Sequence, residues 1–212
     1  MAGGLERKVM DIIKHIAKKY NVDVSTDQVK LPIGRMRDMT KLFAELGLNK
    51  GAEIGVYRGT YSDALLKHNP KLHLTGVDSW AVYPGYRDFQ VNDIADAYIA
   101  AQEMYKKYAD RATLIKGWSR EVAAQIPDES LDFIYIDANH DYPHAVEDLA
   151  AWVPKVRKGG VVAGHDYDDF SRTSRWYDMH VLYALDGWVK SYKIKPLFLT
   201  SNNTATSWMY VK

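Results

Sequence analysis

The chain has 212 residues, of which 47% are hydrophobic and 26% are charged, and its formal net charge is +1 at pH 7. This size predicts one compact domain, and the low charge excludes the basic surface that nucleic acid or an anionic membrane requires. The expected partner is therefore a small molecule. No apolar run approaches the length of a membrane-spanning helix, and the first residues lack the apolar region of a signal peptide, which predicts a cytoplasmic protein. The absence of cysteine excludes disulfides and thiolate metal sites.

The predicted elements alternate between helices and strands. Helical spacing of apolar residues predicts helices at 5–20 and 36–46. Beyond them, branched apolar runs predict strands at 52–56, 72–77, 112–115, 131–136 and 161–163, and helical patterns fall at 60–67, 93–108, 119–125, 143–153 and 179–192. This alternation predicts an α/β fold with a doubly wound, mostly parallel sheet and helices on both faces. Two last runs, 195–200 and 206–211, predict an antiparallel C-terminal hairpin, which makes seven strands.

A segment with two spaced glycines follows the first predicted strand. Gly55 and Gly59 can adopt backbone angles that a Cβ forbids, so the main chain can approach a ligand where a helix begins. Glu53, just before them, suits a ligand with an ammonium group or hydroxyls and argues against a dinucleotide. Asp78 ends the next strand, where a carboxylate can accept both hydroxyls of a ribose. The alternative for Asp78 is a helix N-cap.

This pattern, Glu-x-Gly-x-x-x-Gly with a later acid, resembles the cofactor site of class I S-adenosylmethionine-dependent methyltransferases. The resemblance implies the same cofactor here, a methyltransferase domain at 35–212, and a helical extension at 1–34 that acts as a lid or an oligomer contact. It implies these cofactor-binding residues: Glu53, Gly55, Tyr57, Gly59, Asp78, Ser79, Trp80, Trp118, Ser119 and Asp137. Trp80 would lie against the adenine or in the core, and Ser119 would hold the adenine, as in catechol-type O-methyltransferases, or cap a helix.

A second motif block lies at the ends of the fourth and fifth strands. There Asp137 precedes His140 by three residues, and His165 is followed by Asp166. Because neighbouring parallel strands lie about 4.8 Å apart, these ends can face one another across a single ion. The block resembles the small O-methyltransferase group that includes macrocin-type and cephalosporin-hydroxylase-like enzymes. That resemblance implies that Asp137 and His140 are catalytic, with His140 as the base, and that a metal site holds Asp137, His165 and Asp166.

The histidine in this site departs from the acidic pair of that group. An imidazole shifts the metal preference from magnesium towards manganese, iron, cobalt or zinc. The alternative is that no metal binds and that the His165–Asp166 pair orients the substrate or the cofactor.

The resulting expectation is a methyltransferase that acts on a hydroxyl of a small polar acceptor, such as a sugar or a glycosylated metabolite. An N-methyltransferase, a nucleotide-sugar enzyme on the same fold, and a silent cofactor-binding or oligomeric structural module are the alternatives. The Asp137–His140 pair argues against a silent module, because neither side chain is needed to hold the cofactor. The long passage at 80–98, together with the N-terminal helix, is expected to cover the pocket.

Overall fold

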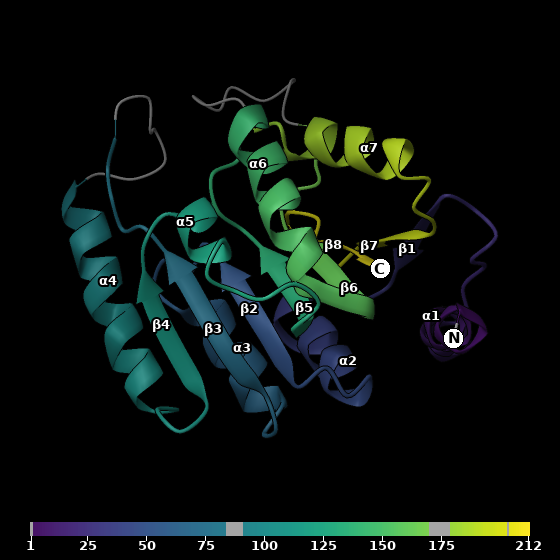
Figure 1. Cartoon of the computed structure of the whole chain (residues 1–212), viewed down its shortest axis with the longest axis horizontal. Coiled ribbons are helices and arrows are strands. Elements are labelled where there is room, and N and C mark those ends of the chain that lie inside the picture. Colours follow the sequence, from purple (N-terminus) through teal and green to yellow (C-terminus); the bar gives the residue numbers. More distant parts are fainter. Residues whose placement is uncertain (1, 84–90, 170–178, 203) are drawn as a thin grey trace.

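The computed structural model describes residues 2–83, 91–169, 179–202 and 204–212. Within these ranges the chain forms an eight-stranded sheet in the order β1-β7-β8-β6-β5-β2-β3-β4 (Figure 1). The strands are β1 (Gln28–Leu31), β2 (Lys50–Ile54), β3 (His73–Asp78), β4 (Ala112–Lys116), β5 (Leu131–Ile136), β6 (Val156–Gly164), β7 (Leu197–Thr200) and β8 (Trp208–Val211). Strands β2 to β6 pair in parallel, and β8 is antiparallel to both β6 and β7. The predicted doubly wound α/β sheet with antiparallel C-terminal strands is confirmed.

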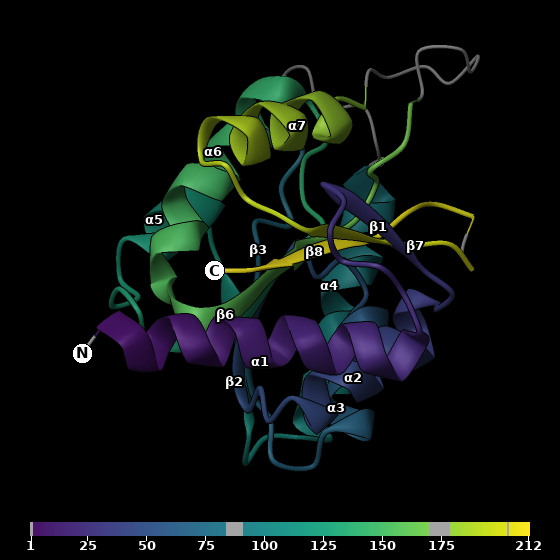
Figure 2. The ribbon, with the colours of Figure 1, turned by 90° about the vertical axis from the view of Figure 1, so that its right-hand side faces the viewer.

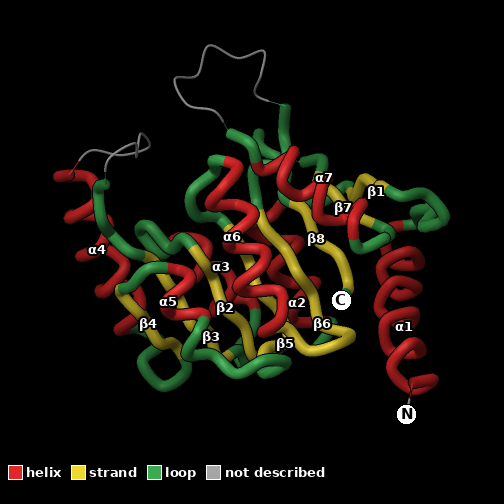
Figure 3. Tube along the Cα trace, turned by 45° about the horizontal axis from the view of Figure 1, so that its top comes forward, coloured by secondary structure: helices red, strands yellow, loops and turns green. Residues whose placement is uncertain are grey.

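Helices cover both faces of this sheet. They are α1 (Ala2–Tyr20), α2 (Thr40–Glu45), α3 (Thr60–His68), α4 (Val91–Lys106), α5 (Ser119–Ala123), α6 (Tyr142–Trp152) and α7 (Val181–Ser191). Helices α1 to α3 pack on the face of β5 that carries Phe133 and Tyr135, whereas α5 to α7 pack on the face that carries Ile134. Figure 3 shows α5, α6 and α7 on the near side of the yellow strands. Successive residues of β5 are thus buried on opposite faces, as expected for a strand inside a covered parallel sheet.

Strand β1 was not predicted from the sequence. It has four residues, of which Val29 and Leu31 are buried and Gln28 and Lys30 are exposed. It pairs in parallel with β7, with Val29 opposite Phe198. An alternation this short does not distinguish a strand from a loop, so only the neighbouring strand reveals it.

Helix α1 runs lengthwise beside β6 and β8 (Figure 2). Its Ile13 and Ile16 are buried in the same core cluster as Phe133. The suggestion that residues 1–34 act as a lid or an oligomer contact stays a prediction.

Several element boundaries differ from the predicted ones. The helix predicted at 36–46 begins with a π-helical turn, Arg35–Met39, that continues into α2, and the strand predicted at 161–163 extends over Val156–Gly164. Helix α4 begins at Val91, so the passage after β3 is shorter than 80–98, and its residues 84–90 lie outside the described residues. In the described ranges no helix combines the length and the apolar character needed to cross a membrane.

Candidate active site

A cavity of about 700 Å³ opens at the carboxyl ends of the parallel strands. Strand β2 pairs with β3 on one side and with β5 on the other, and the helices that follow β2 and β5 pack on opposite faces. A crevice therefore forms where the strand order reverses, which is where open α/β sheets bind ligands. The predicted site residues that line it are Glu53, Gly55, Tyr57, Asp78, Ser79, Trp118, Ser119, Asp137 and His140.

Gly55 allows the ends of β2 and β5 to meet. Its φ is +89°, and a Cβ there would lie 2.0 Å from the carbonyl oxygen of Asp137, so only glycine fits. The Asp137 N–H donates to the Ile54 carbonyl (2.7 Å), and the Gly55 N–H donates to the Val77 carbonyl (2.9 Å). Three strand ends are thereby fixed together below the cavity. Gly59, with φ +79°, is the N-cap of α3 and is not among the described residues that line the cavity.

Glu53 lies in the wall of the cavity, although only 2% of it is exposed. The Ser62 hydroxyl donates to its Oε2 and also shares a hydrogen bond with the Tyr105 hydroxyl (2.8 Å). Burial raises the pKa of Glu53 to about 8, and the bond from Ser62 offsets this only in part. At neutral pH this carboxyl therefore keeps its proton until a positively charged group binds beside it.

Asp78 is held rigidly at the end of β3. Its Oδ2 accepts a hydrogen bond from the Tyr57 N–H (2.9 Å), and its Oδ1 accepts one from the Trp80 N–H (2.8 Å). Burial raises its pKa, while these backbone donors lower it. The carboxylate thus links the loops after β2 and β3. It also faces the cavity, where its remaining lone pairs can accept hydrogen bonds from hydroxyl groups.

The structure distinguishes the two tryptophans of the predicted cofactor site. Trp80 is 5% exposed, donates its indole N–H to the Tyr57 carbonyl (2.9 Å) and packs against Tyr98. It belongs to the core and is not among the described residues that line the cavity. Trp118 is 45% exposed at the cavity wall, where its ring meets Tyr83 edge-on (5.3 Å between centroids). Trp118 and Tyr83 are therefore the aromatic side chains that a flat base would meet.

Ser119 is the first residue of α5, and the N-cap position falls on Trp118. The Ser119 hydroxyl donates to Asp148 of α6. Asp148 is 6% exposed and lines the cavity. No sequence pattern distinguished Asp148, because its partner is 29 residues away in the chain.

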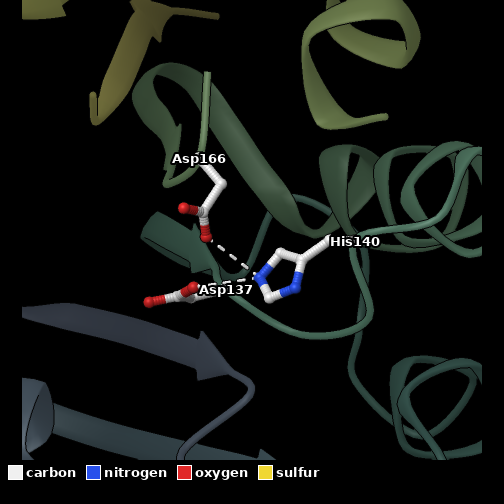
Figure 4. A group of neighbouring side chains, drawn as sticks. All are labelled: Asp137, His140 and Asp166. Carbon is white, nitrogen blue, oxygen red and sulfur yellow. Dashed lines mark ion pairs between the residues drawn. The ribbon is translucent and has the colours of Figure 1, made fainter. Parts of the chain in front are cut away.

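Asp137, His140 and Asp166 meet at the edge of the cavity (Figure 4). His140 Nε2 lies 3.0 Å from Asp166 Oδ2 and 3.5 Å from Asp137 Oδ1. Burial alone would raise the pKa of both carboxyls, but hydrogen bonds and positive charge from His140 and His165 outweigh it, and both pKa values are lowered. Both acids are therefore ionised at neutral pH. One ligand atom from each of the three residues lies within 4.8 Å of the others.

The predicted metal ligands also meet here. Asp137 and Asp166 come together, and both His140, the predicted base, and His165 lie against them. His165 Nδ1 lies 3.0 Å from Asp166 Oδ2 and 3.8 Å from Asp137 Oδ1. It lines a smaller cavity on the side of α7. The loop after β5 carries His140 back over the strand end, which the motif spacing alone does not reveal.

Arg35 and Tyr61 are cavity residues that the sequence analysis missed. Arg35 Nη1 donates to Asp137 Oδ2 (2.8 Å), and its guanidinium lies over the Tyr61 ring (5.6 Å). The Tyr61 hydroxyl is buried and has no hydrogen-bond partner among the described residues. A buried hydroxyl without a partner is costly, so this atom indicates a ligand contact. Arg35 and Asp137 lie 102 residues apart, and no local pattern joins them.

The family model described as a methyltransferase domain matches residues 52–167, more than half of the chain. The chain belongs to this methyltransferase family. The matched span contains the glycine segment, Asp78 and all three residues of the Asp137–His140–Asp166 cluster. The class I S-adenosylmethionine-dependent methyltransferase expected from the sequence is thereby confirmed.

Solved structures share the fold of this methyltransferase. A Staphylococcus aureus protein assigned by name to the caffeoyl-CoA O-methyltransferases is 14% identical, with a TM-score of 0.64 over 95% of this chain and 91% of that one. A Bacillus cereus O-methyltransferase in complex with S-adenosylhomocysteine is 16% identical, with a TM-score of 0.60 over 97% and 91%. A Podospora anserina methyltransferase with the same ligand is 20% identical, with a TM-score of 0.57 over 82% and 76%. The comparison with curated proteins gave no match.

The buried carboxyl of Glu53 makes the stability of the methyltransferase depend on pH. Because its pKa of about 8 in the folded state exceeds the usual 4.5, the folded protein holds this proton more tightly than the unfolded chain does. The free energy of unfolding contributed by Glu53 therefore falls as pH rises from about 5 to about 8. The glutamine of Glu53→Gln cannot ionise. As pH rises over that range, we therefore expect the free energy of unfolding of the variant, measured relative to wild type, to increase by roughly 2 to 4 kcal/mol.

Urea denaturation of both proteins across this pH range measures the effect. Glu103→Gln is the control, because it removes the same charge from an exposed position on α4. A stability difference for Glu53→Gln that stays constant with pH would show that Glu53 ionises freely in the folded protein.

Proposed function

We propose that this methyltransferase transfers the methyl group of S-adenosylmethionine to a hydroxyl oxygen of a small polar acceptor, such as a sugar or a glycosylated metabolite. The observation that carries the proposal is the position of His140 at the cavity edge, against the carboxylates of Asp137 and Asp166. A hydroxyl is a poor nucleophile until its proton is removed, and a histidine in its neutral form can remove that proton.

The polar groups of the cavity suit the methionine end of the cofactor. Arg35 and the partnerless Tyr61 hydroxyl suit a carboxylate, because one brings positive charge and the other a buried donor. Glu53 and Asp137 suit the ammonium and sulfonium charges of the same end. A cofactor that carries these charges would let Glu53 ionise, which agrees with its raised pKa in the structure.

The rest of the cavity suits the nucleoside end. Asp78 offers carboxylate oxygens for the ribose hydroxyls, and the base would then lie toward Trp118 and Ser119, which follow the neighbouring strand β4. Two of the solved structures with this fold hold S-adenosylhomocysteine, the product that methyl transfer leaves behind. These features support the same cofactor in this chain.

The side chains of the cluster have distinct roles in the proposed reaction. The acceptor oxygen forms a bond to the methyl carbon as the carbon–sulfur bond breaks, and the acceptor proton passes to His140. Asp137 and Asp166 stabilise the resulting imidazolium, because both are ionised and lie within 3.5 Å of its Nε2. General-base catalysis of this kind contributes about 10²- to 10⁴-fold to a rate.

Asp137, His140 and Asp166 also fit a divalent cation. Two carboxylates and one imidazole are a mixed ligand set that favours manganese, cobalt, iron or zinc over magnesium. When bound, such a cation would lower the pKa of a coordinated hydroxyl. The cluster thus removes the acceptor proton in either state, and chelation distinguishes the two.

His140→Ala tests the role of the cluster in proton removal. We expect this variant to keep its affinity for S-adenosylmethionine and its fold, but to lose about 10²-fold or more in kcat. His73→Ala is the matched control, since His73 is exposed at the opposite end of β3. The measurement is the steady-state rate on an acceptor whose product is shown to be methylated at oxygen. Equal kcat for His140→Ala and wild type would remove His140 from the mechanism.

Metal removal tests the role of a cation. If a cation activates the acceptor hydroxyl, exhaustive treatment with EDTA abolishes activity, and manganese or cobalt restores it better than magnesium, because one of the three ligands is an imidazole. Calorimetry of manganese binding to the chelated protein and to Asp166→Asn provides a readout that does not depend on turnover. Full activity after chelation would assign proton removal to His140 without a cation.

A further inference from the structure

Asp148 is a buried carboxyl of the cavity that methyl transfer itself does not use. It lies on α6, which packs against α5, and it is 6% exposed. Its Oδ1 accepts a hydrogen bond from the Ser119 hydroxyl, whereas no described residue donates a hydrogen bond to its Oδ2. Burial raises its pKa to about 6, so the carboxyl is mainly ionised at neutral pH despite its environment. Asp148 Oδ2 is therefore an ionised oxygen of a cavity residue that can accept a hydrogen bond from a ligand.

The hydrogen bonds behind Asp148 have a fixed direction. The Trp152 indole N–H donates to Ser119 Oγ (2.8 Å), and an indole nitrogen can only donate. The Ser119 proton is therefore directed to Asp148 Oδ1. This chain from Trp152 through Ser119 holds the carboxylate in place and leaves its second oxygen as an acceptor.

Asp148 lies at the adenine end of the proposed cofactor position. Strand β4 pairs with β3 so that Lys116 is opposite Asp78, and the Gly117 N–H donates to the Asp78 carbonyl (2.9 Å). Ser119 follows two residues later, and its hydroxyl donates a hydrogen bond to Asp148. A ribose on Asp78 thus places its base between the β3 and β4 loops, next to Ser119 and Asp148.

We propose that Asp148 accepts a hydrogen bond from the exocyclic amino group of the adenine and thereby makes the cofactor site select adenine over a 6-oxo purine. This inference rests on the proposed function, because it requires the cofactor in this cavity. A hypoxanthine base presents a carbonyl oxygen where adenine presents the amino group. That oxygen would face the Asp148 carboxylate and be repelled by it.

Paired titrations test this selectivity. We expect wild-type protein to bind S-adenosylhomocysteine at least tenfold more tightly than S-inosylhomocysteine, measured by calorimetry at neutral pH. In Asp148→Asn the Ser119 hydroxyl still donates to the side-chain carbonyl, so the amide NH₂ takes the place of Oδ2. An NH₂ there repels the adenine amino group and suits the 6-oxo group. The variant should therefore lose at least tenfold affinity for the adenosyl ligand and prefer the inosyl ligand.

Glu103→Gln is the control, because it removes a carboxylate charge from an exposed position on α4 outside the cavity lining. It should keep the wild-type preference. Equal affinity of wild-type protein for the two ligands overturns the role of Asp148 without any variant, and an Asp148→Asn protein that keeps the wild-type ratio overturns it as well. Either result, with tight binding of S-adenosylhomocysteine to wild type, leaves the proposed function intact. Failure of wild type to bind S-adenosylhomocysteine contradicts both.

Discussion

The contact between Gly55 and the backbone of Asp137 determines where the other functional groups of this methyltransferase lie. A Cβ on Gly55 would lie 2.0 Å from the Asp137 carbonyl oxygen, so the ends of β2 and β5 can approach only at a glycine. The approach closes the bottom of the crevice and holds Asp137 above it. It also brings Asp78, from the strand on the other side of β2, to the same cavity. The side chains proposed to bind the cofactor and to act in catalysis therefore lie around the same rigid strand ends.

The acids around the cavity differ in their protonation states. Glu53 is predominantly neutral at pH 7, whereas the two acids of the cluster are ionised because histidines lie against them. Arg35 adds a positive charge bound to Asp137. The cavity thus holds acids in two protonation states within one site. In the proposed reaction, the positive charges of the cofactor and the acceptor hydroxyl that loses its proton make different demands, and these two kinds of acid suit them.

The sequence predicted the sheet because the alternation of branched runs and helical patterns is a local signal. The predicted residues at strand ends, such as Asp78 and His140, were placed correctly at the cavity because parallel strands end at one edge. Local patterns do not reveal tertiary partners. Arg35 contacts an acid 102 residues away, and strand β1 exists only because β7 lies beside it. Spacing also could not show that His140 lies against the same two acids as His165.

The central claim is that this cavity binds S-adenosylmethionine with its ribose on Asp78. Calorimetric titration of S-adenosylhomocysteine into wild-type protein and Asp78→Asn tests it most directly, with NAD as a competing ligand. The account predicts that wild type binds S-adenosylhomocysteine and not NAD, and that the variant binds it roughly ten- to a hundredfold more weakly, as expected for lost charge-assisted hydrogen bonds. Equal affinity in the two proteins, or tighter binding of NAD by wild type, would contradict it.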